Sequence, residues 1–172
     1  MGLELPKVLK NFNLMVDGIG YGGRCKSIQL PKLTRKTVEL EGAGLDAPIE
    51  VDMGQEKIEL PEIVLFETPP DIITQFGTGR LDAFRVRVLG AIKRDNSNIE
   101  EPIEITMQGA WKELDMGTWQ RGDIAELKLS GSLIYYKLVI AGRVIFEIDK
   151  LNGIHNIDGV DVLAQRRAIL EL

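Results

Sequence analysis

Regular alternation of apolar and polar residues recurs along this chain, and it constrains the fold more than any other feature. Successive side chains of a β-strand point to opposite faces, so a period of two predicts strands that bury one face. Turn-forming pairs such as Asp17-Gly18, Ala141-Gly142 and Asp158-Gly159 separate the stretches, which favours antiparallel hairpins. The sequence therefore predicts a mainly β fold, an antiparallel β-barrel or sandwich. The alternating stretches are Phe12–Val16, Phe84–Ile92, Ile103–Met107, Ala125–Leu129 and Val144–Ile148.

Two short segments have helical signals. Thr68–Asp71 introduces Ile72–Phe76 through two prolines, and Gly77 ends the run. Near the end of the chain, Val160–Arg167 has apolar and basic residues at helical spacing. Neither a repeat nor a proline-rich linker divides the 172 residues. We therefore expect one domain over residues 1–172, with one or two short α-helices flanking the sheet.

The segment Thr34–Gln55 is the least globular in composition. Its centre is rich in glycine and alanine, and the stretches on either side have the composition of strands. Basic residues precede it and acidic residues follow, which indicates either two solvated strand faces or complementary patches on a self-associating subunit. We expect a protruding loop at about 34–55 that is poorly ordered in a free subunit.

Charge and hydropathy exclude several classes of protein. A net charge of −5 disfavours tight binding to nucleic acid, which needs clustered lysine and arginine. The longest apolar run, Leu133–Ile140, is interrupted by Lys137 and is far shorter than the roughly 20 residues of a membrane helix. A single cysteine, Cys25, cannot form an intramolecular disulfide, and the N-terminus does not resemble a secretory signal. We expect a cytoplasmically made protein without stable membrane association.

Residue patterns for catalysis are missing from the sequence. The glycine-rich stretch Gly18–Gly23 is not a phosphate-binding loop, because Cys25 occupies a position that requires glycine. His155 is the only histidine, which leaves no multi-histidine metal site. The carboxylates between Asp46 and Glu56 do not have the spacing of an EF-hand loop. We expect a structural protein with no catalytic residues, no cofactor and no metal.

Several short strings carry a resemblance to a known family. They occur in the family's order from about residue 10 to the end, and this collinearity is more specific than any one string. Taken together they resemble the major tail tube proteins of contractile-tailed phages, a family that includes the inner tube subunits of R-type bacteriocins. The strings are Leu30–Lys36, Gly42–Ile49, Val51–Gly54, Lys112–Trp119, Tyr135–Leu138, Glu147–Ile154 and Asp158–Leu163.

The resemblance implies a β-barrel or sandwich of the tail-tube type, whose subunits form hexameric rings. Rings would stack into a hollow tube inside a contractile sheath, with a baseplate and a tape measure protein as further partners. DNA would pass through the lumen without specific binding, or the tube would breach a cell envelope. Such a protein is assembled in the cytoplasm of a bacterial host and resides in the virion tail. A tube subunit of a type VI secretion system is the first alternative, and a monomeric β-barrel binding module is the second.

Three sets of residues are candidates for these roles. A strand over Ile49–Met53 would place Glu50 and Asp52 on the face opposite its apolar residues, and we expect this pair to face the lumen. Their alternative role is to pair with cations of an adjacent subunit, for which the candidates are Lys32, Arg35 and Lys36. The residues expected to contact a neighbouring ring are Gly42, Ala43, Gly44, Leu45, Asp46, Ala47 and Pro48.

Overall fold

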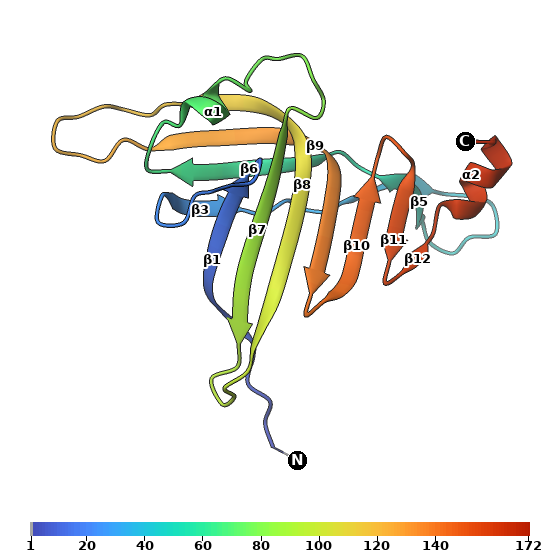
Figure 1. Cartoon of the computed structure of the whole chain (residues 1–172). Coiled ribbons are helices and arrows are strands. Elements are labelled where there is room, and N and C mark those ends of the chain that lie inside the picture. The colour runs from blue at the N-terminus through green and yellow to red at the C-terminus, as the bar shows by residue number, and fades with distance from the viewer. Residues whose placement is uncertain (1) are drawn as a thin grey trace.

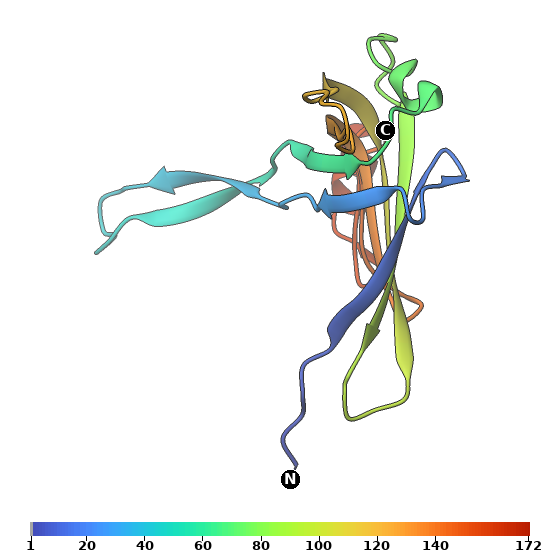
Figure 2. The ribbon, with the colours of Figure 1, turned by 90° about the vertical axis from the view of Figure 1, so that its left-hand side faces the viewer.

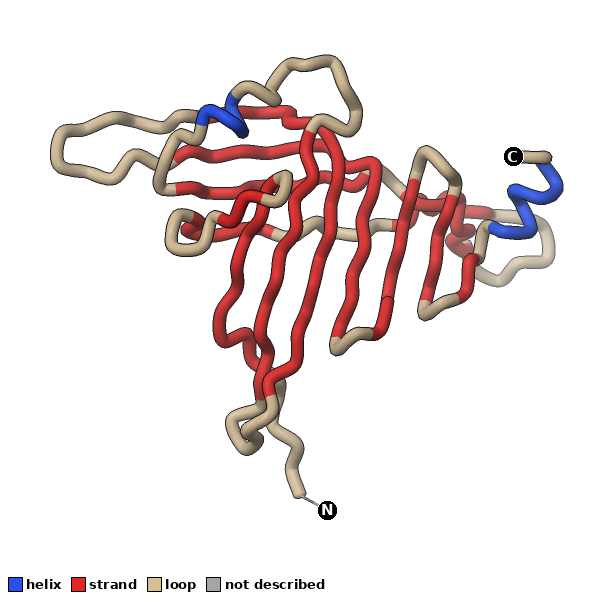
Figure 3. Tube along the Cα trace, viewed as in Figure 1, coloured by secondary structure: helices blue, strands red, loops and turns tan. Residues whose placement is uncertain are grey.

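The computed structural model describes residues 2–172, and antiparallel strands dominate it (Figures 1 and 3). The mainly β prediction is confirmed, with two short helices beside the sheet. The helices are α1 (Pro70–Ile73) and α2 (Ala164–Leu170). The strands are β1 (Val8–Val16), β2 (Ile19–Gly20), β3 (Cys25–Gln29), β4 (Arg35–Leu40), β5 (Ile49–Gln55), β6 (Ile58–Leu65), β7 (Phe84–Lys93), β8 (Glu100–Asp115), β9 (Leu127–Ile140), β10 (Arg143–Asp149), β11 (Ile154–Ile157) and β12 (Val160–Asp161).

One large antiparallel sheet is bent so that two parts of it cross. Its main order is β12-β11-β10-β9-β8-β7-β1-β2, while β6 pairs with β9, and β3 pairs with β6. Strand β9 joins the two parts, because Tyr135–Ile140 pairs with β10 whereas Leu127–Leu133 pairs with β6. In Figure 1, β3 and β6 lie across the upper ends of β1 and β7.

A bulge in β9 lies at this bend. The register between β8 and β9 shifts between Gln108 and Gly109, where the pairing passes from Tyr135 to Leu133 and skips Ile134. A Cβ atom added at Gly109 would lie 2.0 Å from the carbonyl oxygen of Ser132, so only glycine permits the two backbones to approach this closely.

Tight turns connect neighbouring strands at three of the predicted positions. Asp17-Gly18, Ala141-Gly142 and Asp158-Gly159 all have positive φ at both residues, with values from 49° to 85°. Two consecutive positive φ angles are typical of the type I′ turn, whose twist matches that of the flanking strands. The residue types at these positions were therefore sufficient to predict the turns.

The core lies between the crossing parts of the sheet and beneath α1. Leu14, Phe84 and Met107 are almost fully buried there, and Ile72 contributes from α1. The rings of Phe84 and Trp111 stack with centroids 3.9 Å apart. In addition, the Trp111 indole Nε1 donates a hydrogen bond of 3.0 Å to Gln75 Oε1, just after α1. Burial of these large side chains supplies most of the driving force for folding.

Strands β4 and β5 form a separate two-stranded sheet, the projecting hairpin, which covers Arg35–Gln55. In Figure 2 it extends to the left, away from the sheet that contains β1 and β7. We expected a protruding segment at about 34–55 with strands on either side of its glycine-rich centre, and the structure has strands over Arg35–Leu40 and Ile49–Gln55 with Glu41–Pro48 between them. Val38 and Leu40 lie opposite Val51 and Ile49, so cross-strand pairs form on one face.

Candidate functional site

Among residues 2–172, no group of three or more histidine, cysteine or acidic side chains could hold a metal ion. In the part of the chain that the structure describes, no helix is both long and apolar enough to cross a membrane.

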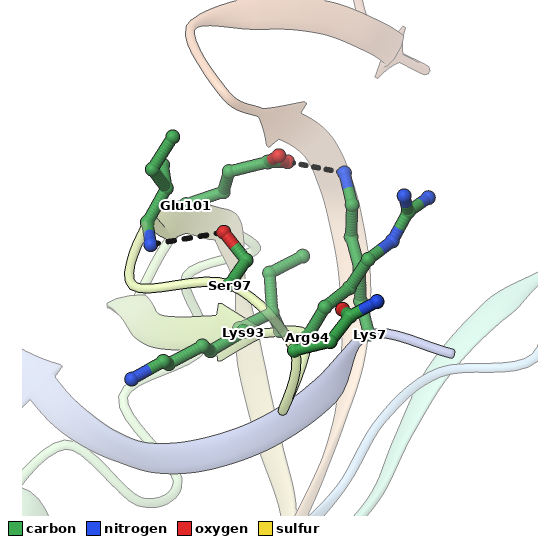
Figure 4. Close-up of a pocket in the computed structure, with 8 residues that line it drawn as sticks. Lys7, Lys93, Arg94, Ser97 and Glu101 are labelled. Atoms are coloured by element: carbon green, nitrogen blue, oxygen red, sulfur yellow. Dashed lines mark hydrogen bonds and ion pairs between the residues drawn. The ribbon is translucent and has the colours of Figure 1, made fainter. Parts of the chain in front are cut away.

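A pocket of about 330 Å³ lies where the β7–β8 turn meets the N-terminal segment (Figure 4). Two of its three cations are engaged in ion pairs, since Lys7 Nζ lies 2.5 Å from Glu101 Oε2, and Arg94 Nη2 lies 3.0 Å from Glu4 Oε2. Ser97 Oγ accepts a hydrogen bond of 3.1 Å from the backbone N–H of Ile99. These contacts hold the turn in place, and no base lies beside the serine to activate it.

The environment of Cys25 does not activate its thiol. Burial raises the pKa of the half-buried Cys25 thiol, which disfavours the reactive thiolate. The neighbouring cations Arg24 and Lys26 do not offset this effect, because they pair with Glu67 and Glu126 at 2.8 and 2.6 Å.

His155 lies on β11 at the base of the projecting hairpin and is 7% exposed. Burial lowers the pKa of its imidazole, and the positive charge of Arg35 lowers it further. The side chains of Arg35, Asp52 and Val162 line the same hollow. The histidine is therefore a neutral part of the contact between the hairpin base and the C-terminal strands.

The projecting hairpin has two chemically different faces. Cross-strand partners are Val38 with Val51, Glu39 with Glu50, and Leu40 with Ile49. One face is thus apolar and the other carries carboxylates, as the alternation in the sequence predicted.

The apolar face of the hairpin is uncovered in the single chain. A two-stranded hairpin with both edges free is at best marginally stable in water, and free edges pair readily with other strands. The four apolar side chains of this face are 38–49% exposed. They are Val38, Leu40, Ile49 and Val51.

The carboxylate face carries one internal ion pair and, within residues 2–172, two acids without an ion pair, Glu39 and Glu50. Arg35 Nε lies 2.8 Å from Asp52 Oδ2, and the backbone N–H of Gly54 donates to Asp52 Oδ1 at 2.7 Å. The Arg35 hydrogen bond is the main reason that the pKa of Asp52 is lowered. Glu50 lies opposite Glu39, so two like charges face each other without a bridging cation.

The other candidate residues lie on the hairpin, except Lys32, which precedes it. Arg35 is engaged by Asp52 of its own chain, whereas Lys32 and Lys36 form no ion pair within residues 2–172. The segment Gly42–Pro48 makes up the turn at the tip, where the Leu45 N–H donates to the Gly42 carbonyl at 3.1 Å. Gly44 has a φ of 92°, a conformation that favours glycine.

Comparisons with known proteins place this architecture in a family. The model of the family described as phage tail tube protein FII matches residues 6–170. The chain belongs to the phage tail tube protein FII family. Membership identifies a structural tail tube protein of contractile phage tails, not an enzyme.

Relatives within the family match along nearly their whole length. The chain is 35% identical to the tail tube protein of Escherichia phage P2, over 96% of this chain and 97% of that protein. It is 32% identical to the major tail tube protein of Serratia phage KSP20, over 95% of each.

Solved structures share the fold of this FII-family chain at low sequence identity. One is the sheath/tube terminator of an extracellular contractile injection system, with a TM-score of 0.56 and 12% identity over 81% of this chain and 99% of that one. The sheath-tube complex of such a system contains another, with a TM-score of 0.52 and 10% identity over 78% and 90%. The tail-tube type of fold is therefore confirmed.

Two exposed features of this family member were not predicted. An apolar groove lies between β1, β7 and β3, and its walls come from distant parts of the chain. The loop between β8 and β9 displays Trp119, which is 71% exposed, whereas Trp111 is in the core. The sequence shows that the residues of the groove are apolar, but it did not predict that they form one surface.

Proposed function

We propose that this chain forms hexameric rings that stack into the hollow inner tube of a contractile tail. The observation that carries the proposal is the projecting hairpin, whose edges are unpaired and whose apolar face is uncovered. A monomer gains nothing from such a surface, whereas a subunit that packs against copies of itself buries it. Membership in a tail tube family supports the same conclusion.

The partners follow from the proposed tube. A solved relative in fold comes from a sheath-tube complex, so we infer a contractile sheath around this tube. A baseplate at one end and a tape measure protein inside complete the proposed assembly. The tube would be built in the bacterial cytoplasm and remain in the virion tail.

The carboxylate face of the hairpin suits a channel for DNA. We infer that Glu50 and Asp52 face the lumen, with Glu39 beside Glu50. Screening limits a single exposed charge to about 8 Å at physiological salt, but stacked rings would repeat these charges at short intervals. Repulsion between carboxylates and phosphates would then let DNA slide without binding.

Assembly of the purified protein tests the proposal directly. We expect negative-stain electron microscopy to show rings or tubes, and size-exclusion chromatography to show species far larger than 19.2 kDa. A featureless monomer at all concentrations would contradict the proposal and favour a monomeric β-domain.

Replacement of Glu50 and Asp52 by lysine is expected to leave tubes intact and to make them retain DNA. Glu50 is exposed and has no ion pair within residues 2–172, and lysine at Asp52 removes contacts with Arg35 and Gly54 that lie on the hairpin surface, so the core of the body is unchanged. Electron microscopy measures tube formation, and co-sedimentation with double-stranded DNA measures retention.

A matched variant separates lumen charge from overall charge. Lysine at Asp123 and Glu171, two exposed acids outside the hairpin, changes the net charge equally and is expected to retain less DNA. Loss of tubes in the Glu50/Asp52 variant alone would instead assign these carboxylates to a contact between subunits.

A further inference from the structure

Side chains, rather than strand pairing, hold the base of the projecting hairpin against the body. Strands β4 and β5 form their own sheet, and among residues 2–172 no ladder of backbone hydrogen bonds joins them to another strand. Residues 30–34 lie outside the strands on one side of the hairpin, and residues 56–57 do so on the other. The hairpin can therefore change its orientation at these two connections without breaking any strand pairing.

A bulge in β5 shapes the base of the hairpin. The pairing with β4 passes from Gly54 to Asp52 and skips Met53, and Gly54 has a φ of 115°. At the bulge the Asp52 carboxylate accepts the Gly54 N–H at 2.7 Å and pairs with Arg35 at 2.8 Å. These contacts join Arg35 and Asp52 as one unit at the end of the hairpin that meets the body.

A hollow of about 470 Å³ lies between the hairpin base and the C-terminal strands of the body, where β5 comes close to β11 and β12 (Figure 1). His155 is the titratable side chain that the body contributes to this hollow, and its other residues there are apolar. The body provides Phe146, Ile148, His155, Ile157 and Val162, and the hairpin base and its connection provide Leu33, Arg35, Asp52 and Gln55.

Charged groups face His155 from β4, β5, β12 and α2, while the side chains of β10 in the hollow are apolar. On the hairpin side, Asp52 is engaged by Arg35. On the other side, Asp161 accepts the His155 backbone N–H at 3.3 Å and is paired with Arg167 of α2 at 2.5 Å. Both carboxylates near the imidazole are therefore already neutralised by an arginine.

An added proton on His155 is unfavourable while the hairpin base covers it. Burial lowers the pKa of the imidazole, Arg35 lowers it further, and Asp161 and Asp52 offset these effects only in part. Arg166 of α2 lines the adjoining hollow and adds another positive charge. In water the imidazole would have its ordinary pKa of about 6.5. Binding of a proton therefore favours orientations of the hairpin that expose His155 to water.

We propose that His155 is a pH-sensitive switch for the orientation of the projecting hairpin within a single chain. With a neutral imidazole the hairpin base packs over the hollow, and protonation releases the base, because the imidazolium then gains contact with water. Docking is complete above about pH 7 and is lost as the pH falls. Between the ordinary pKa and the lower pKa of the docked state, the ratio of released to docked chains rises by up to about tenfold for each pH unit.

Single-molecule fluorescence energy transfer measures the orientation of the hairpin at concentrations that keep the chain monomeric. Dyes are attached through Glu41→Cys, near the tip of the hairpin, and Leu151→Cys, in the turn between β10 and β11, both of which are exposed. Cys25→Ser removes the chain's own cysteine. We expect one narrow distribution of transfer efficiency at pH 8 and a second, broader population that grows between pH 7 and pH 5.

Two substitutions of the histidine in the labelled chain separate its charge from every other effect of pH. His155→Gln keeps a polar side chain that does not titrate in this range, and we expect it to retain the pH 8 distribution at pH 5. His155→Lys carries a positive charge throughout the range, and we expect the broad population already at pH 8. Circular dichroism checks that both variants fold.

The outcomes distinguish this switch from the proposed function. Energy transfer that is the same at pH 8 and pH 5, a change with pH that persists in His155→Gln, or a docked hairpin in folded His155→Lys at pH 8 would each overturn the switch and leave the tube proposal intact. Absence of rings and tubes from the unmodified chain would overturn the tube proposal and leave the switch intact, because the switch acts within one chain.

Discussion

Deletion of Gly42–Ala47 is expected to abolish the formation of long tubes and to leave a folded subunit. The six residues belong to the turn at the tip of the projecting hairpin, and none of them is buried. Glu41 and Pro48 cannot form a two-residue turn, because proline fixes φ near −65°, so the Leu40–Ile49 pair would open and a longer turn would connect the strands. A neighbouring ring would lose its contact with the tip, while the core between the crossing sheets would be unchanged.

Circular dichroism, thermal unfolding and electron microscopy measure these effects separately. We expect a melting temperature close to that of the unmodified chain, together with single rings or very short tubes. Replacement of the same six residues by a glycine-serine segment of equal length is the matched control, because it keeps the reach of the hairpin but removes its side chains. Tubes of normal length in the deletion variant would exclude the tip as the ring-stacking element.

Replacement of Trp111 by alanine is expected to lower the free energy of unfolding by about 3–5 kcal/mol. The indole is 6% exposed and stacks on Phe84, and its N–H donates to Gln75. Truncation would open a cavity beside Phe84 and break the contact that attaches the segment after α1 to the sheet. For a chain of this size, each kcal/mol lowers the melting temperature by roughly 2–4 °C.

Trp119→Ala is the matched control, since it removes the same side chain from an exposed loop. The indole of Trp119 is 71% exposed, so its loss should change the stability of the monomer by about 0.5 kcal/mol or less. Equal destabilisation by the two substitutions would contradict the assignment of Trp111 to the core. Thermal unfolding at a concentration that keeps the chain monomeric provides the comparison.

Elements whose signals are local were predictable from the sequence. Alternation in Phe84–Ile92 and Ile103–Met107 indicated strands, and these segments lie within β7 and β8. The pairs Asp17-Gly18 and Ala141-Gly142 form the tight turns that their residue types favour. Period-two patterning also assigned Glu50 and Asp52 to one face of a strand, because side-chain direction in a strand depends only on parity.

Local sequence patterns were not sufficient to predict the candidate surfaces. The sequence indicated a protruding segment at Thr34–Gln55 with strands beside its glycine-rich centre, but it did not indicate that these two strands would pair with each other apart from the main sheet. It did not indicate that Arg35 would engage Asp52 of its own chain, because that contact depends on the register of the hairpin.

By itself, the sequence determined the strand content, the positions of tight turns, the absence of catalytic motifs and the resemblance to tail tube proteins. Tertiary structure alone decided the bend at Gly109, the isolation of the projecting hairpin and the groove that unites Leu9, Leu30 and Ile103. The physical reason is the distance along the sequence between the residues that interact. Strand patterns and turns depend on neighbouring residues, whereas the groove depends on packing between β1, β3 and β8, which are far apart along the chain.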